Sequence, residues 1–170
     1  MSFAQCSHLH MAANELQVLL ADDDMDDCLL FKEALEELPL STRLTFVNDG
    51  DQLMKLLKST KRLPHVVFLD LNMPRKNGFE CLTEIMGNDK LKALPAIIYS
   101  TSFEQGVIDR LYKNGAHHFI KKPFEFLQLK RVIHYSLTLI MNKTSLQRTQ
   151  NNFILTGEND FVNANYGYIK

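Results

Sequence analysis

The sequence predicts an α/β domain with a doubly wound, five-stranded parallel sheet. Short aliphatic runs alternate along the chain with longer segments whose apolar residues recur at helical spacing, and this alternation is typical of repeated βα units. A chain of 170 residues is long enough for one such domain with short extensions. The expected strands are 17–22, 43–47, 65–70, 96–100 and 117–120.

The third and fourth expected strands are apolar at nearly every position. Their sequences are HVVFLD at 65–70 and AIIYS at 96–100. A strand with one face in solvent alternates between apolar and polar residues, whereas a strand covered on both faces does not. We therefore expect helices on both faces of the sheet.

The first expected helix, 25–38, follows a run of aspartates and ends before Pro39. Asp24 is the predicted N-cap, because its carboxylate can accept hydrogen bonds from the first free backbone amides of the helix. Asp26 and Asp27 fall in the first turn, where negative charge is favourable at the positive end of the helix dipole. We assign these three aspartates to the helix start.

Turn residues separate the remaining four helices. The sequence Asn-Asp-Gly precedes the second helix, a glycine begins the third, and Asn-Gly follows the fourth, as expected for residues that start and stop helices. The last helix has apolar residues at steps of three and four along one face. These helices are expected at 51–59, 78–86, 103–113 and 125–141.

Composition and charge exclude several classes of function. Nineteen Lys and Arg against twenty Asp and Glu give a net charge of −1, which argues against a nucleic-acid or anionic-membrane binder. No stretch approaches the roughly eighteen apolar residues of a membrane span, and the first residues do not form a signal peptide. Three cysteines without metal-ligand spacing indicate a reducing compartment, so we expect a cytoplasmic protein.

The expected domain spans 17–141, between a flexible N-terminal lead at 1–16 and a tail at 142–170. The tail is rich in asparagine and only weakly basic, and it is too short to hold a separate DNA-binding output domain. We expect its one apolar stretch, 153–155, to pack back onto the domain.

Charged and polar residues follow the expected strands at one edge of the sheet. In an open parallel sheet, ligands bind beyond the carboxyl ends of the strands. Neighbouring strands would therefore bring these side chains into one pocket. The residues are Asp22 and Asp23 after the first strand, Asp70 after the third, Ser100 ending the fourth and Lys122 after the fifth.

Three converging carboxylates require a cation among them. At about 4 Å and an effective dielectric constant near 20, two carboxylates repel by roughly 4 kcal/mol. Oxygen ligands on a rigid scaffold favour Mg²⁺, which takes few protein ligands and keeps several waters. A metal ion beside a carboxylate, a hydroxyl and an ammonium suits phosphoryl transfer in which one aspartate attacks phosphorus.

From residue 17 to residue 140 the chain resembles the receiver domains of two-component response regulators, the CheY-like family. Each motif alone is weak, but all five in register are highly specific. The resemblance implies a flavodoxin-like (βα)5 fold with strand order 2-1-3-4-5. The five motifs are LLADDD at the end of the first strand, FLDLNMP after the third, Gly78 four residues past that proline, Ser100, and Lys122-Pro123-Phe124.

The resemblance also implies a role for each acidic residue. Asp70 would accept a phosphoryl group from a histidine kinase or a histidine phosphotransfer protein. Asp23 would bind Mg²⁺ directly and Asp22 mainly through water. Asp70 and the backbone carbonyl of Asn72 would complete the metal ligands supplied by the chain.

Three further residues have implied roles around the phosphoryl group. Ser100 would hydrogen-bond one phosphoryl oxygen, and Lys122 would pair with another. Phe119 stands at the position of the family's switching aromatic residue. Ser100 replaces the commoner threonine, which keeps the hydroxyl but loosens its rotamer, and Phe119 replaces the commoner tyrosine and so lacks a phenolic hydroxyl.

Other functions fit parts of this pattern. A haloacid-dehalogenase-like phosphohydrolase also uses an aspartyl nucleophile with Mg²⁺, but Asn72 replaces its second carboxylate and the chain has no room for a substrate cap. A receiver fold that serves only as a binding module would not need the intact site residues. A calcium-binding loop at 22–33 is disfavoured, because Asp27 stands where such a loop needs glycine.

We expect a signalling switch and not an enzyme, with slow self-dephosphorylation at most. The resemblance implies that phosphorylation of Asp70 changes the face formed by the fourth helix, the fifth strand and the fifth helix. The fifth helix has apolar residues beyond one stripe. We therefore expect this helix, or the face that contains it, to contact a downstream protein or a second copy of the chain as a homodimer.

Overall fold

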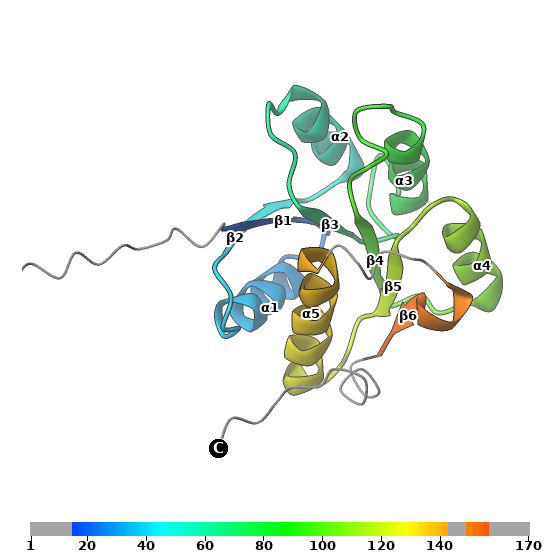
Figure 1. Cartoon of the computed structure of the whole chain (residues 1–170). Helices are drawn as coiled ribbons and strands as arrows, with labels where there is room; N and C mark the ends of the chain where they lie inside the picture. The colour runs from blue at the N-terminus through cyan, green and yellow to red at the C-terminus, as the bar shows by residue number, and fades with distance from the viewer. Residues whose placement is uncertain (1–14, 143–148, 157–170) are drawn as a thin grey trace, which may run out of the picture.

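A six-stranded parallel sheet runs through the centre of the molecule (Figure 1). The computed structural model describes residues 15–142 and 149–156. Its strand order is β2-β1-β3-β4-β5-β6, which confirms the expected order 2-1-3-4-5 and adds a sixth strand. The strands are β1 (Leu16–Ala21), β2 (Thr42–Val47), β3 (Val66–Leu69), β4 (Ala96–Ser100), β5 (His118–Lys121) and β6 (Ile154–Leu155).

Five α-helices cover both faces of this sheet, as the sequence predicted. Helices α1 and α5 lie on one face, and α2, α3 and α4 lie on the other (Figure 1). A short 3-10 helix, η1 (Gln150–Asn152), precedes β6. The α-helices are α1 (Met25–Glu36), α2 (Gly50–Ser59), α3 (Gly78–Met86), α4 (Gln105–Lys113) and α5 (Phe126–Met141).

Two helices are each two residues shorter than the sequence predicted. Helix α1 ends at Glu36, because the next turn tightens and the amide of Leu38 bonds to Leu35, three residues back. Helix α4 begins at Gln105 and leaves Phe103 in the preceding loop. The ring of Phe103 packs against Phe119 with 5.9 Å between the ring centroids.

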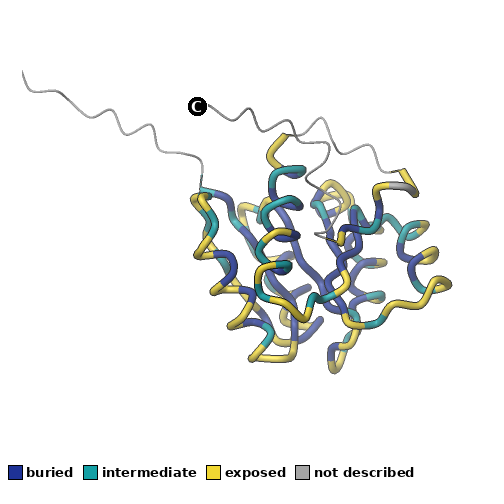
Figure 2. The backbone as a smooth tube through the Cα atoms, turned by 90° about the horizontal axis from the view of Figure 1, so that it is seen from below, coloured by how far each residue is buried: buried dark blue, intermediate teal, exposed yellow. Residues whose placement is uncertain are grey.

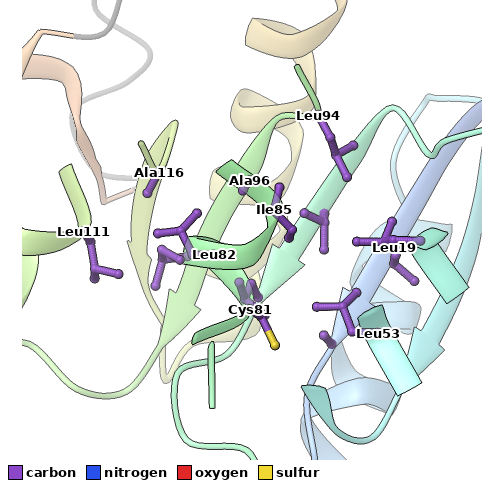
Figure 3. Packing of buried hydrophobic residues seen from close by; sticks show 14 of the residues in the cluster. Leu19, Leu53, Cys81, Leu82, Ile85, Leu94, Ala96, Leu111 and Ala116 are labelled. Atoms are coloured by element: carbon purple, nitrogen blue, oxygen red, sulfur yellow. The ribbon is translucent and has the colours of Figure 1, made fainter. Parts of the chain in front are cut away.

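The core consists of two hydrophobic clusters, one on each side of the sheet. Val18 and Leu20 of β1 belong to the cluster under α1 and α5. Leu19 and Ala21 belong to the cluster under α2, α3 and α4, part of which is shown in Figure 3. Because successive side chains of a strand point to opposite faces, both faces of β1 need apolar residues. Figure 2 shows the resulting buried centre in dark blue.

The sixth strand comes from the tail, and its docking confirms that the apolar stretch packs back onto the domain. Strand β6 pairs in parallel with β5, and the amide of Phe119 donates to the carbonyl of Phe153 at 2.8 Å. The Phe153 side chain is 2% exposed and meets the ring of Tyr112 edge-on, with centroids 5.2 Å apart. The edge of β5 is therefore covered by the chain itself.

Residues 1–14, 143–148 and 157–170 lie outside the described part of the chain. The expectations of a flexible lead and of a tail without an output domain therefore stay predictions. Within the described ranges, no helix is both long enough and apolar enough to cross a membrane.

Truncating Phe153 to alanine is expected to lower the free energy of unfolding by about 3 kcal/mol, the lower end of the range for a buried phenylalanine. The matched control is Phe124→Ala, because Phe124 is 96% exposed and its truncation should change stability by less than about 0.5 kcal/mol. Urea unfolding of both variants measures the difference. Equal stability of the two variants would show that β6 contributes nothing to the fold.

Candidate functional site

Backbone hydrogen bonds that continue past the strands place the site residues at one edge of the sheet. Asp22 follows β1, and its amide donates to Val47 of β2 at 3.1 Å. The amide of Asp70, after β3, donates to Ala21 at 2.9 Å, and that of Lys122, after β5, donates to Ser100 at 3.0 Å. The side chains that follow these strands therefore start from neighbouring backbone positions, as predicted.

Asp22, Asp23 and Asp70 form an acidic cluster. Each offers one carboxylate oxygen, and these oxygens all lie within 4.8 Å of one another. Asp22 and Asp70 are buried, whereas Asp23 is exposed. Backbone amides bind the two buried carboxylates: Asp24 N–H donates to Asp22 at 3.1 Å, and Asn72 N–H donates to Asp70 at 2.7 Å. The predicted convergence of the three acids is confirmed in the fold.

The ammonium of Lys122 lies among several carboxylates. Its Nζ is 2.6 Å from Asp22 Oδ2, 2.7 Å from Asp27 Oδ2 and 3.6 Å from Asp70 Oδ1. It also lies 5.3 Å from the centre of the Tyr99 ring, within cation–π range. Burial lowers the pKa of Lys122, but the carboxylates outweigh burial and hold that pKa above its ordinary value. Lys122 is therefore charged at neutral pH.

Asp22 remains incompletely satisfied in spite of this ion pair. Its Oδ2 is buried without a well-directed hydrogen bond from the described residues, although Lys122 Nζ lies close by. Burial raises the pKa of Asp22, and the attraction of Lys122 offsets this in part. The buried carboxylate of Asp22 and the two further carboxylates beside it provide an oxygen ligand set that fits a hard divalent cation such as Mg²⁺.

The β3–α3 loop packs closely behind Asp70. A Cβ atom at Gly78 would lie 2.1 Å from the carbonyl oxygen of Asp70, so glycine is required at this position. The amide of Gly78 donates to Leu71 at 3.0 Å. In the same loop Arg75 has a φ of 66°, and its guanidinium lies 3.0 Å from the buried carboxylate of Asp49. These contacts connect the loop after Asp70 to the start of α2.

Ser100 and Phe119, the two residues assigned to a switch, are both fully buried. Ser102 N–H donates a long 3.4 Å hydrogen bond to the Ser100 hydroxyl, and the Asn72 side-chain amide donates to Ser102 Oγ at 3.2 Å. Phe119 packs under Phe103, which is 48% exposed. The roles of Ser100, Phe119 and the Asn72 carbonyl stay predictions.

One residue of the site, Asp27, is not among the site residues predicted from the sequence. Asp24, Asp26 and Asp27 are predicted at the helix start, and Asp24 does cap α1 by accepting hydrogen bonds from the amides of the other two. Asp27, however, binds the Lys122 ammonium. Helical side chains lean toward the helix N-terminus, so a carboxylate in the first turn of α1 can reach back toward the strand ends. The direction of helical side chains was therefore the signal in the sequence that could have placed Asp27 at the site.

Fold and site together define a doubly wound α/β protein with a cluster of carboxylates at one edge of the sheet. Residues 18–134 match the family model of the response regulator receiver domain, and the chain belongs to this family. Receiver domains are the phosphoacceptor switches of two-component signalling. The function expected from the sequence, two-component phosphoacceptor signalling, is therefore confirmed.

Several known proteins are similar in sequence to the chain. The probable chemotaxis protein CheY of Rhizobium etli is 31% identical over 121 residues, which cover 71% of this chain and 92% of that protein. The probable methanogenesis regulatory protein FilR2 of Methanothrix harundinacea is 30% identical over 120 residues, covering 68% and 77% respectively.

Two similar solved structures are response regulators. The phosphorylated cyanobacterial phytochrome response regulator RcpA has a TM-score of 0.70 at 27% identity, covering 76% of this chain and 96% of that chain. The Mn²⁺-bound form of response regulator Rcp1 has a TM-score of 0.63 at 25% identity, covering 79% and 96%.

The comparisons give no support to the phosphohydrolase alternative. The side chain of Asn72, where that class of enzyme needs a second carboxylate, is an amide that donates a hydrogen bond to Ser102. General acid catalysis by this side chain is therefore not available.

Replacing Asp22 with asparagine is expected to stabilise the metal-free protein at neutral pH. Burial raises the pKa of Asp22 above its ordinary value of 3.8, so the native state keeps a proton that the unfolded chain has already released. The free energy of unfolding of the wild type therefore falls as pH rises from the pKa of Asp22 in the unfolded chain to its higher pKa in the native state. The asparagine variant has no carboxyl group to ionise at this position. It should therefore be more stable than the wild type at pH values above the native pKa of Asp22.

Urea unfolding in EDTA, from about pH 3.5 to about pH 8, measures this difference. Asp89→Asn is the control. Because the Asp89 side chain is 93% exposed, this substitution should leave the dependence of unfolding free energy on pH unchanged. A less stable Asp22→Asn variant at neutral pH would mean that the attraction of Lys122 exceeds the cost of burying the carboxylate.

Proposed function

We propose that Asp70 is the phosphoacceptor of this receiver domain. The observation that carries the proposal is the position of its carboxylate, buried at the centre of the edge, within the acidic cluster and 3.6 Å from the Lys122 ammonium. An oxygen of Asp70 attacks phosphorus, and the bond from phosphorus to the donor nitrogen of a phosphohistidine breaks. The electron pair of that bond leaves with the imidazole.

The neighbouring residues would stabilise the charge that this transfer creates. Lys122 would neutralise one phosphoryl oxygen, and the Ser100 hydroxyl would donate a hydrogen bond to another. Asp22, Asp23, Asp70 and the backbone carbonyl of Asn72 would hold Mg²⁺. When bound, the metal neutralises negative charge on the phosphoryl oxygens. The Mn²⁺-bound form of Rcp1, a protein of similar fold, supports a divalent cation at this site.

The signal would pass from the site to the surface through β4 and β5. Ser100 ends β4, and movement of its side chain toward the phosphoryl group would free space for Phe119 on the adjacent strand. Phe119 contacts Phe103 in the β4–α4 loop, so a change at Phe119 alters an exposed aromatic side chain. The phosphoryl group would be lost slowly, and the chain would act as a switch and not as an enzyme.

Changing Asp70 to asparagine is expected to abolish labelling by acetyl phosphate with Mg²⁺, because an amide is not a nucleophile toward phosphorus. Intact-protein mass spectrometry measures the added phosphoryl mass. Asp89→Asn is the matched control and should be labelled like the wild type, since its side chain is almost fully exposed. Undiminished labelling of the Asp70 variant would refute the assignment, and labelling of the wild type in EDTA would refute the metal requirement.

We propose a histidine kinase or histidine phosphotransfer protein as phosphoryl donor, and a downstream protein or a second copy of the chain as the target, in the cytoplasm. Since β6 covers the edge of β5, contact would use the exposed sides of α4 and α5, including Leu127, which is 53% exposed. Sedimentation with beryllofluoride and Mg²⁺ should show a dimer. A monomer both with and without beryllofluoride would refute homodimerisation.

A further inference from the structure

Three carboxylates lie close to the ammonium of Lys122. Asp22 and Asp70 contact it from the ends of β1 and β3. Asp27 contacts it from α1, and its Oδ2 accepts a hydrogen bond from Nζ at 2.7 Å. This contact is shorter than the 3.6 Å between Lys122 and Asp70. In the unphosphorylated protein, the lysine is therefore held closer to Asp27 than to the residue we propose as phosphoacceptor.

Asp27 differs in position from the acids of the metal cluster. It lies outside the set of oxygens that come within 4.8 Å of one another, and its side chain is 35% exposed. The side chain of Lys122 is only 9% exposed, and the Tyr99 ring lies 5.3 Å from Nζ. The position of the ammonium is thus set by Asp22 and Asp27, with the Tyr99 ring close by.

We propose that Asp27 is a positioning residue that holds the Lys122 ammonium away from Asp70 until a phosphoryl group competes for it. The proposal rests on Asp70 being the phosphoacceptor. An ammonium has three N–H donors, and Asp22 and Asp27 lie at hydrogen-bonding distance from it. A phosphoryl group on Asp70 would compete with Asp27 for the positive charge of the Lys122 ammonium. This competition lowers the stability of the phosphorylated state.

A neutral side chain of the same size at position 27 therefore has a predictable effect. In Asp27→Asn the amide keeps an acceptor oxygen but loses its negative charge, so its hold on the ammonium weakens. Lys122 is then free to pair with the anion at Asp70. The variant should bind beryllofluoride, a phosphoryl mimic, more tightly than the wild type. A gain in affinity cannot arise from damage to the fold.

The experiment titrates beryllofluoride into the full chain at saturating Mg²⁺ and follows amide signals by NMR, so that changes in Mg²⁺ affinity do not enter. Asp27→Asn should bind about fivefold more tightly, the upper end expected for an ion pair with one partly exposed partner. Asp26→Asn is the matched control: it removes the same charge from the same exposed helical turn without a contact to Lys122, and its affinity should match that of the wild type.

Each outcome decides the proposal. Equal affinity of Asp27→Asn and the wild type would overturn it, and so would weaker binding, which would mean that Asp27 directs Lys122 toward the phosphoryl group. Equal tightening in Asp26→Asn would show a general effect of charge and would also overturn it. A wild type that does not bind beryllofluoride would instead refute Asp70 as phosphoacceptor, and this result is distinct from the other three.

Discussion

The structure depends on one electrostatic constraint, the burial of carboxylates around a single ammonium. Asp22 and Asp70 are almost fully buried, and each has a backbone amide donor. Lys122 is the cation that contacts both of them within the described residues. Buried charges are tolerated when they are paired and hydrogen-bonded. The remaining excess of negative charge makes the edge suitable for a divalent cation, which would in turn offset the charge of a transferred anionic group.

The fold supplies the positions that this arrangement needs. Parallel strands end at one edge, and both faces of the sheet are covered, so residues after β1, β3 and β5 meet in a rigid frame. Gly78 lets the next loop pass behind Asp70 without a side chain in the way. At the end of the sheet opposite to β2, strand β6 pairs with the free edge of β5. The backbone of Phe119 is thereby bonded to the chain's own tail at 2.8 Å.

The strands, the helices and the acidic cluster could be predicted from the sequence, because apolar runs, helical spacing and strand-end acids are local signals. Two features depended on contacts between distant segments. Asp27 and Lys122 are 95 residues apart, and the local setting of Asp27 fits a helix start equally well. Strand β6 has two residues, too few for a strand pattern, and it forms because Phe153 and Leu155 are buried against the completed sheet.

Thermal unfolding with and without Mg²⁺ measures whether the acidic cluster binds a divalent cation. Ligand binding to the native state at ten times the dissociation constant adds about 1.4 kcal/mol to the free energy of unfolding. We predict that Mg²⁺ raises the melting temperature of the wild type and has little effect on Asp23→Asn, whose replaced side chain is exposed. An equal Mg²⁺-dependent rise in both proteins, or none in the wild type, would show that the cluster does not bind the metal.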